Sequence, residues 1–160
     1  MRKPEIPRSK DEVCDRVSTQ SPRLLNAVSP LASRRSDRVL LILRLVLSGI
    51  IAAHGWARLI AGGVDPFGVW LDIQGIPFGL AIAWGITVLE ILGTPLLAMG
   101  RMVTPLCSLY ALIYIAGIVL VHAPEGWFVV GLGRNGMEYS VLLVICLLGL
   151  AYRHFPGRHQ

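Results

Sequence analysis

Two ionisable side chains lie inside long apolar stretches of the 160-residue sequence, where they could act on a proton or a ligand. Arg44 lies about one and a half turns into the first stretch, and Glu90 lies near the middle of the second. An ionisable group at membrane depth costs at least ~2.5 kcal/mol on insertion scales, so it is expected to face the protein interior and to have a partner. We expect Arg44 and Glu90 to form an inner charged pair. The pair could fix helix register as a buried ion pair, or it could be part of a proton relay or the floor of a ligand cavity.

A second polar group is expected where the apolar stretches end, and we call it the outer polar site: His54, Arg58, His122 and Glu138. His54 and Arg58 are four residues apart and share one helical face. A cation-rich pocket with one carboxylate could hold a quinone headgroup or an oxyanion such as a sulfur oxyacid, or its members could simply hold one another. Two histidines on different helices could also ligate haem b, which is the less favoured cofactor.

Other chemistries have no support in the sequence. There is no phosphate-binding loop, no Ser/His/Asp arrangement and no pair of metal-binding carboxylates. Cys14, Cys107 and Cys146 are isolated and lack metal-ligand spacing, so we expect neither a metal site nor a cofactor attached within the chain. The pI of 9.6 does not indicate a nucleic-acid partner, because nine of the fifteen basic residues lie at or before Arg38.

Hydropathy predicts the elements that position these side chains. The chain is 54% hydrophobic and 16% charged with a mean hydropathy of +0.61, which is too apolar for an ordinary soluble domain. Four apolar stretches approach the roughly 20 residues that cross a bilayer as a helix. The predicted fold is all-α, a four-transmembrane-helix bundle with a short interfacial helix after the first span. The predicted spans are residues 39–60, 78–99, 103–121 and 137–152.

The flanking segments predict the topology. Residues 1–37 form a basic leader rich in Ser and Pro, which we expect to be disordered. The membrane domain covers residues 38–152, and residues 153–160 form a short tail. Lys and Arg in short segments stay on the cytoplasmic side, so a multi-pass protein of the plasma membrane with both termini in the cytoplasm is expected. Its partner is the lipid bilayer, and homo-oligomers are compatible with so small a bundle.

An ordered series of residues along the chain resembles the DoxX family of small four-helix membrane proteins. The series consists of Arg44, Gly49, His54-Gly55, Arg58, Gly75-Ile76-Pro77, Glu90, Gly93, Gly100-Arg101, His122, Gly136 and Glu138. The sequence departs from the family pattern in its leader, in its tail and at Thr94, where the family has a second glycine.

The resemblance implies a membrane subunit of an oxidoreductase system, linked to quinones or sulfur compounds, that works with a redox partner protein. Whether the chain is itself an enzyme is left open. The alternative is a non-enzymatic membrane scaffold or small-solute permease whose buried charges are structural.

Overall fold

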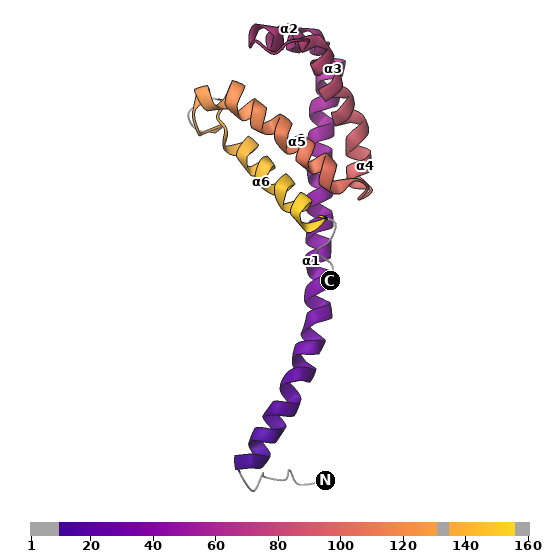
Figure 1. Ribbon diagram of the computed structural model, residues 1–160, viewed down its shortest axis with the longest axis vertical. Helices are drawn as coiled ribbons and strands as arrows, with labels where there is room; N and C mark the ends of the chain where they lie inside the picture. The colour runs from indigo at the N-terminus through magenta and orange to yellow at the C-terminus, as the bar shows by residue number, and fades with distance from the viewer. Residues whose placement is uncertain (1–9, 131–134, 156–160) are drawn as a thin grey trace. The chain divides into compact units, whose positions relative to one another are not determined.

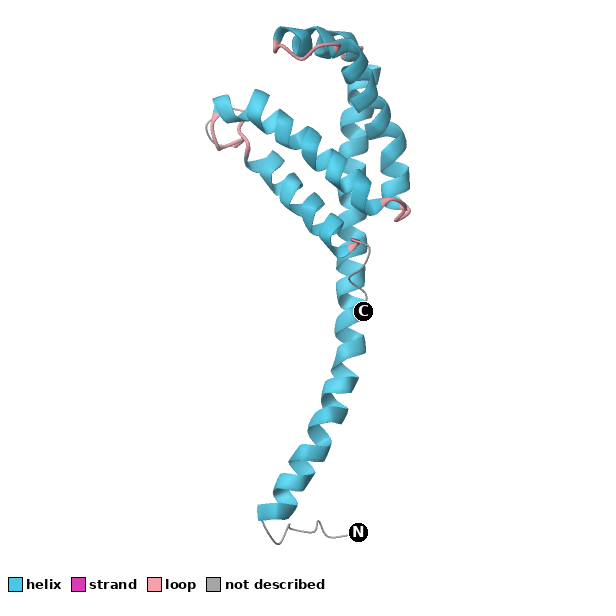
Figure 2. Cartoon of the chain, in the orientation of Figure 1, coloured by secondary structure: helices cyan, strands magenta, loops and turns pink. Residues whose placement is uncertain are grey.

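The computed structural model describes residues 10–130 and 135–155. Contacts divide the chain into two units, Met1–Leu41 and Ile42–Gln160, and each is described by itself. All regular structure of the described residues is helical, as Figures 1 and 2 show, which confirms the all-α class.

The first helix, α1 (Lys10–Ile60), contains most of the leader for which disorder was predicted. Residues 10–37 are helical in the structure, which differs from that prediction, and residues 1–9 lie outside the described part of the chain. The physical reason is cooperativity. Nucleating a helix is costly, but extending one that already exists adds one hydrogen bond for each residue fixed. The apolar end of α1 supplies that nucleus, and hydropathy alone does not reveal it.

Two further long rods follow α1. The first consists of α3 (Gly79–Val88), the π-helical turn η1 (Leu89–Gly93) and α4 (Thr94–Ala98). The second consists of α5 (Val103–Gly117), the π-helical turn η2 (Ile118–His122) and the 3₁₀ turn η3 (Ala123–Glu125). Among the described residues, three helical segments are long and apolar enough to cross a membrane: Arg34–Ile60, Gly79–Ala98 and Val103–Glu125.

The fourth predicted span corresponds to α6 (Glu138–Arg153), which has 16 residues. At 1.5 Å per residue this helix is about 24 Å long, shorter than the ~30 Å of a hydrocarbon core. It packs along α5 as an antiparallel hairpin, and the Thr104 hydroxyl of α5 donates a hydrogen bond to the Ala151 carbonyl of α6 at 3.4 Å. The structure thus contains the helix, and its role as a fourth span stays a prediction.

A short helix, α2 (Val64–Ile73), lies between the first two rods and packs against α3. The contact depends on two glycines, because a Cβ atom on Gly79 would collide with the Gly68 carbonyl oxygen. The Asp72 carboxylate accepts a hydrogen bond from the Gly79 backbone N–H at 2.9 Å and so satisfies the first N–H group of α3. This junction holds α2 over one end of the bundle.

The turn between α4 and α5 makes these two rods antiparallel neighbours. Gly100 has φ = +77°, a left-handed conformation that ends a helix with little strain only in glycine. The Gly100 N–H donates a hydrogen bond to the Leu97 carbonyl, and the Arg101 N–H donates one to the Leu96 carbonyl, each at 2.9 Å. Two of the last carbonyl groups of α4 are therefore satisfied.

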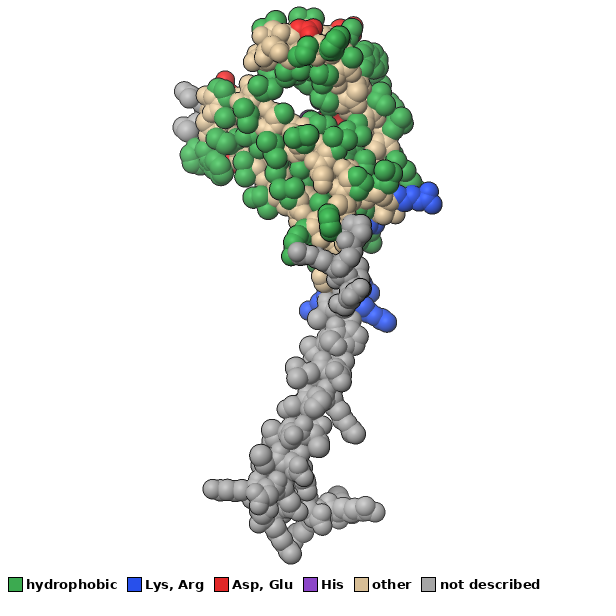
Figure 3. All heavy atoms as spheres, in the orientation of Figure 1, with side chains coloured by type: hydrophobic (Ala, Val, Ile, Leu, Met, Phe, Trp, Pro, Cys, Tyr) green, Lys and Arg blue, Asp and Glu red, His purple; other side chains and the backbone are tan. Residues whose placement is uncertain are grey.

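Apolar side chains fill the core between the helices and also cover their outer surface. Ile51, Leu97, Tyr110 and Leu147 are fully buried between the rods. Large apolar side chains are also exposed along the helices, and they cover most of the described surface in Figure 3. Such a surface is expected where lipid, rather than water, surrounds the helices.

Candidate functional site

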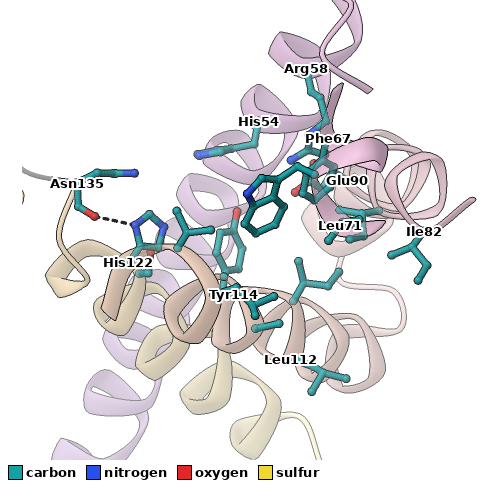
Figure 4. A pocket seen from close by; sticks show the side chains of 18 of the residues that line it. His54, Arg58, Phe67, Leu71, Ile82, Glu90, Leu112, Tyr114, His122 and Asn135 are labelled. Atoms are coloured by element: carbon teal, nitrogen blue, oxygen red, sulfur yellow. Dashed lines mark hydrogen bonds and ion pairs between the residues drawn. The ribbon is translucent and has the colours of Figure 1, made fainter. Parts of the chain in front are cut away.

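A cavity of about 420 Å³ lies between α1, α2 and α3 on one side and the α5–α6 hairpin on the other. Figure 3 shows the molecule hollowed between α2 and α5, and Figure 4 shows the cavity from close by. The volume falls within the range of roughly 300–1,000 Å³ that is typical of small-molecule sites. Most of the wall is apolar. Its polar members are His54, Arg58, Glu90, Tyr114, His122, Asn135, Tyr139 and Ser140.

An ion pair joins the two charged side chains of this wall. The Arg58 guanidinium donates from Nη1 to Glu90 Oε2 at 2.8 Å and to the Thr87 hydroxyl at 3.1 Å. The guanidinium also lies 4.8 Å from the centre of the Phe67 ring, a cation–π contact from α2. The Glu90 side chain is only 4% exposed and that of Arg58 is 20% exposed. The Glu90 carboxylate, the Thr87 hydroxyl and the Phe67 ring therefore hold the Arg58 guanidinium at the edge of the cavity.

The structure pairs Glu90 with Arg58, and the predicted inner pair of Arg44 and Glu90 does not form. Gly55 of α1 lies beside Glu90, whereas the Arg44 guanidinium lies beside Gly100, just after the end of α4. Helical side chains tilt toward the N-terminus, so Arg58 reaches back to the level of Gly55. Arg44 is eleven residues before Gly55 in an antiparallel packing and thus faces the other end. Its Nε is buried without a hydrogen-bond partner among the described residues.

A π-helical turn places Glu90. Within η1 the regular helical hydrogen bonding is interrupted, and two hydroxyl groups satisfy backbone carbonyls there. Tyr110 of α5 donates to the Leu89 carbonyl at 2.8 Å, and Thr94 donates to the Glu90 carbonyl at 2.7 Å. Gly93 makes room for this arrangement, because a Cβ atom there would collide with the Tyr110 hydroxyl. π-Helical turns are rare and often occur at functional sites.

A close approach of α1 brings the two partners of the ion pair together. A Cβ atom on Gly55 would lie 2.8 Å from the Cβ of Glu90, closer than side chains pack. Glycine at this position therefore lets the α1 backbone contact η1 directly.

His54 lies on the same side of α1 as Arg58, as its spacing predicts. Its Nδ1 lies 3.0 Å from the Ile50 carbonyl. Because a carbonyl only accepts hydrogen bonds, Nδ1 carries the proton, and Nε2 is left for a ligand. The ring meets Tyr114 edge to face, with 6.4 Å between ring centres. The Tyr114 hydroxyl is buried and has no hydrogen-bond partner among the described residues.

His122 is held in the same manner on the opposite wall. It ends the second π-helical turn, η2, and its Nδ1 lies 2.9 Å from the Asn135 carbonyl (Figure 4). As in His54, the Nε2 atom of His122 is the ring nitrogen that remains available to a ligand. The two histidines of the outer polar site thus line one cavity with the same ring nitrogen uncommitted.

Glu138, the fourth predicted member, has a different position. It is not among the residues that line the cavity, and its Oε1 accepts a hydrogen bond from the Val129 N–H at 3.0 Å. Glu138, in the first turn of α6, thus fastens the segment before that helix. The structure brings together His54, Arg58 and His122 of the outer polar site, adds Glu90 to them and leaves Glu138 outside.

The sequence does not single out several residues that line the cavity or support its wall. Tyr110 and Tyr114 are four residues apart within an apolar stretch, which was a signal that one helical face of α5 is polar. Thr87 and Thr94 share a helical face with Glu90 and show similar spacing. Phe67 and Trp70 of α2 stack with 6.1 Å between their ring centres. In the sequence they are only two aromatic residues in a segment of mixed polarity, which does not indicate a cavity wall.

The DoxX family model matches residues 39–123, more than half of the chain. The chain belongs to the DoxX family. With its three span-length apolar helices, this member of the DoxX family is a membrane protein. No curated protein and no solved structure matches it. The matched region includes His54, Arg58, Glu90 and His122, and it ends before Glu138.

The described residues contain no group of three or more His, Cys, Asp or Glu side chains arranged to hold a metal ion. What the cavity does offer is a mixture of hydrogen-bond donors and acceptors at the edge of an apolar enclosure. The Arg58 hydrogen bonds found among the described residues all use Nη1, so Nε and Nη2 remain as donors. With Tyr114 and the two imidazole rings, they can bind a polar ring or exchange protons with it.

Proposed function

We propose that this DoxX protein is a membrane subunit of an oxidoreductase system and binds a quinone in the cavity. The observation that carries the proposal is the composition of the cavity wall. A mostly apolar wall favours a flat, apolar ring, and a few convergent polar groups favour the oxygen atoms on that ring. Arg58 and Tyr114 can donate hydrogen bonds to such oxygens, and the Nε2 atoms of the histidines can do so when the imidazole rings are protonated.

Reduction of a quinone to a quinol takes up two electrons and two protons. In this proposal a redox partner protein, which oxidises a sulfur compound or another donor, supplies the electrons. The residues of the chain orient the ring and move protons. The Nε2 atoms of His54 and His122 are suited to that transfer, because imidazole exchanges protons near neutral pH. The protein lies in the plasma membrane as a multi-pass protein with both termini in the cytoplasm.

Fluorescence can test quinone binding, because Trp70 lines the cavity and Trp84 is exposed outside it. Titration of the purified protein with a short-chain ubiquinone or menaquinone analogue is expected to quench tryptophan emission saturably. Trp70→Phe should remove most of the saturable component, whereas the control Trp84→Phe should keep it. Quenching that grows linearly with quinone concentration, or a haem absorption band in the purified protein, would argue against the quinone site.

One observation favours a rival function. Arg58 and Glu90 satisfy each other, and Thr87 and Phe67 complete the environment of the cation. A scaffold or a small-solute permease would need no more from them than to hold α1 against η1. In that case quinones would bind only non-specifically, and substitutions at Tyr114 or Trp70 would leave partner assembly unchanged.

A further inference from the structure

The cavity has two parts with different chemistry. The polar side chains lie toward α1 and the segment before α6, as the positions of Arg58, Glu90, His54 and His122 in Figure 4 show. Ile82 of α3 and Leu112 of α5 lie away from them, where the other lining residues are apolar. A ligand that fills the whole cavity therefore meets hydrogen-bonding groups at one end and hydrocarbon at the other.

The apolar end opens to the outside of the protein. Ile82 and Leu112 line the cavity and are nevertheless 37% and 63% exposed. The neighbouring surface of the same two helices is also apolar, with Leu80, Val88 and Leu109 exposed. Since α3 and α5 belong to span-length helices, this opening faces the hydrocarbon interior of the bilayer rather than water.

The arrangement of the rods explains the opening. α5 contacts α4 next to the turn at Gly100 and packs along α6. Figure 1 shows α5 leaving α3 as it runs away from that turn. Away from the turn both helices line the cavity, with Ile82 and Ile86 of α3 and Leu112 and Ile113 of α5.

We propose that the gap between α3 and α5 is a lateral portal through which the hydrocarbon tail of a membrane-dissolved quinone leaves the cavity. This inference rests on the proposed function and specifies its substrate class, a quinone with a long apolar tail. The ring lies against Arg58, His54 and Tyr114, and the tail passes Ile82 and Leu112. A cavity of about 420 Å³ cannot also enclose a long tail, so the tail needs an exit, and the exit on the lipid side is apolar.

Steric blocking of the portal tests this proposal. The double variant Ile82→Trp/Leu112→Trp places two large rings at the portal. The matched control Leu80→Trp/Leu109→Trp places the same rings on the same two helices, at exposed positions that do not line the cavity. Both variants are titrated with a decyl-tailed benzoquinone and with its tail-free parent, and binding is read from the Trp70 signal against each variant's own background.

The blocked variant should bind the tailed quinone about tenfold or more weakly than the control, because a clash discriminates by shape. It should bind the tail-free quinone as the control does. Equal binding of the tailed quinone by the two variants would overturn the portal. If the unmodified protein binds neither quinone, the proposed function itself is wrong, a separate result.

A second measurement does not depend on the folding of the blocked variant. A quinone with a photoreactive group at the end of a short tail is irradiated with the unmodified protein in lipid nanodiscs, and the labelled peptides are mapped by mass spectrometry. Adducts are expected in α3 and α5, near Ile82 and Leu112. Adducts confined to α2, or to the segment from Trp127 to Val130, would mean that the tail leaves elsewhere and would overturn the proposal.

Discussion

At the scale of single residues, Arg58 has the largest energetic consequences. Its charge is mostly removed from water, and its Glu90 partner is almost fully buried. Removing one member of a buried pair is strongly destabilising because the other charge is left uncompensated, whereas replacing both members is much less costly. A double-mutant cycle therefore separates the cost of an orphaned charge from the value of the pair.

Glu90→Gln should lower the free energy of unfolding by about 3 kcal/mol, and Arg58→Met by a similar amount. The double variant should lose clearly less than the two single losses added together. Denaturation with SDS in mixed micelles, followed by circular dichroism, measures each value. Losses that simply add would mean that the two side chains do not interact in the membrane.

Two tyrosines one helical turn apart should give opposite results on loss of the hydroxyl. Tyr110→Phe removes the hydrogen bond to the Leu89 carbonyl and should cost about 1–3 kcal/mol of stability, because that carbonyl is left unsatisfied. Tyr114→Phe removes a hydroxyl that has no partner among the described residues, so stability should be unchanged. Quinone affinity in that variant should fall roughly 3- to 10-fold, the value of one hydrogen bond.

The comparison is informative because each variant serves as the control for the other. Thermal stability and the quinone Kd are measured on both proteins. A stability loss in Tyr114→Phe with unchanged quinone affinity would assign that hydroxyl a structural role.

The sequence predicts which residues matter at this scale better than it predicts how they pair. Hydropathy places His54, Arg58, Glu90 and His122 in or at the ends of apolar helices, and all four line the cavity. The partner of Glu90 was assigned incorrectly because the pairing depends on helix register. Register is set here by the contact of Gly55 with η1 and by the backward tilt of a long arginine side chain.

At the scale of elements, glycines decide where helices touch. Gly55→Ala should lower stability by about 1–3 kcal/mol, because the added methyl group meets the Glu90 Cβ and the backbones must separate. Gly49→Ala is the matched control on the same helix, where nothing lies within 4 Å of an added Cβ. It should be neutral or stabilise the helix by up to about 1 kcal/mol. Equal effects at both positions, measured by thermal unfolding, would contradict the tight contact.

The helices themselves were largely predictable from apolar length, and their irregular turns were not. Three of the predicted spans correspond to span-length helices. Neither η1 nor η2 has a sequence signature, because a π-helical turn depends on tertiary partners such as Tyr110 to satisfy the carbonyls. The start of α1 also differs from the prediction, since continuation of a helix is cheaper than composition suggests.

At the scale of the whole molecule, positive charge predicts the orientation in the membrane. Arg101 lies in the turn after α4, whereas Asp65 and Glu125 lie at the other ends of the rods. Single-cysteine variants at these positions, in a background without the three native cysteines, report which side each faces. Asp65→Cys and Glu125→Cys should react with an impermeant maleimide in intact cells, and Arg101→Cys only after permeabilisation. The reverse pattern would invert the topology.

The predicted bundle of four transmembrane helices depends on α6, whose length as a span is the least well predicted from the sequence. Its 16 residues are too few for an untilted span, and the segment before it is fastened by Glu138 and Asn135. The cavity exists because that segment and α2 lie on opposite sides of it, an arrangement that no local pattern predicts.

The π-helical turn η1 has a geometric consequence for changes in chain length. It holds one residue more than an α-helical turn would, so everything after it is rotated by about 100° relative to an uninterrupted helix. Deleting one residue between Leu89 and Gly93 would let this turn become α-helical and would leave the residues after it in their present orientation, so Leu97 would stay in the core. The same deletion within α4 has no extra residue to draw on and would rotate the residues after it by about 100°. The rod should therefore tolerate the loss of one residue at η1 better than the loss of one in its α-helical parts.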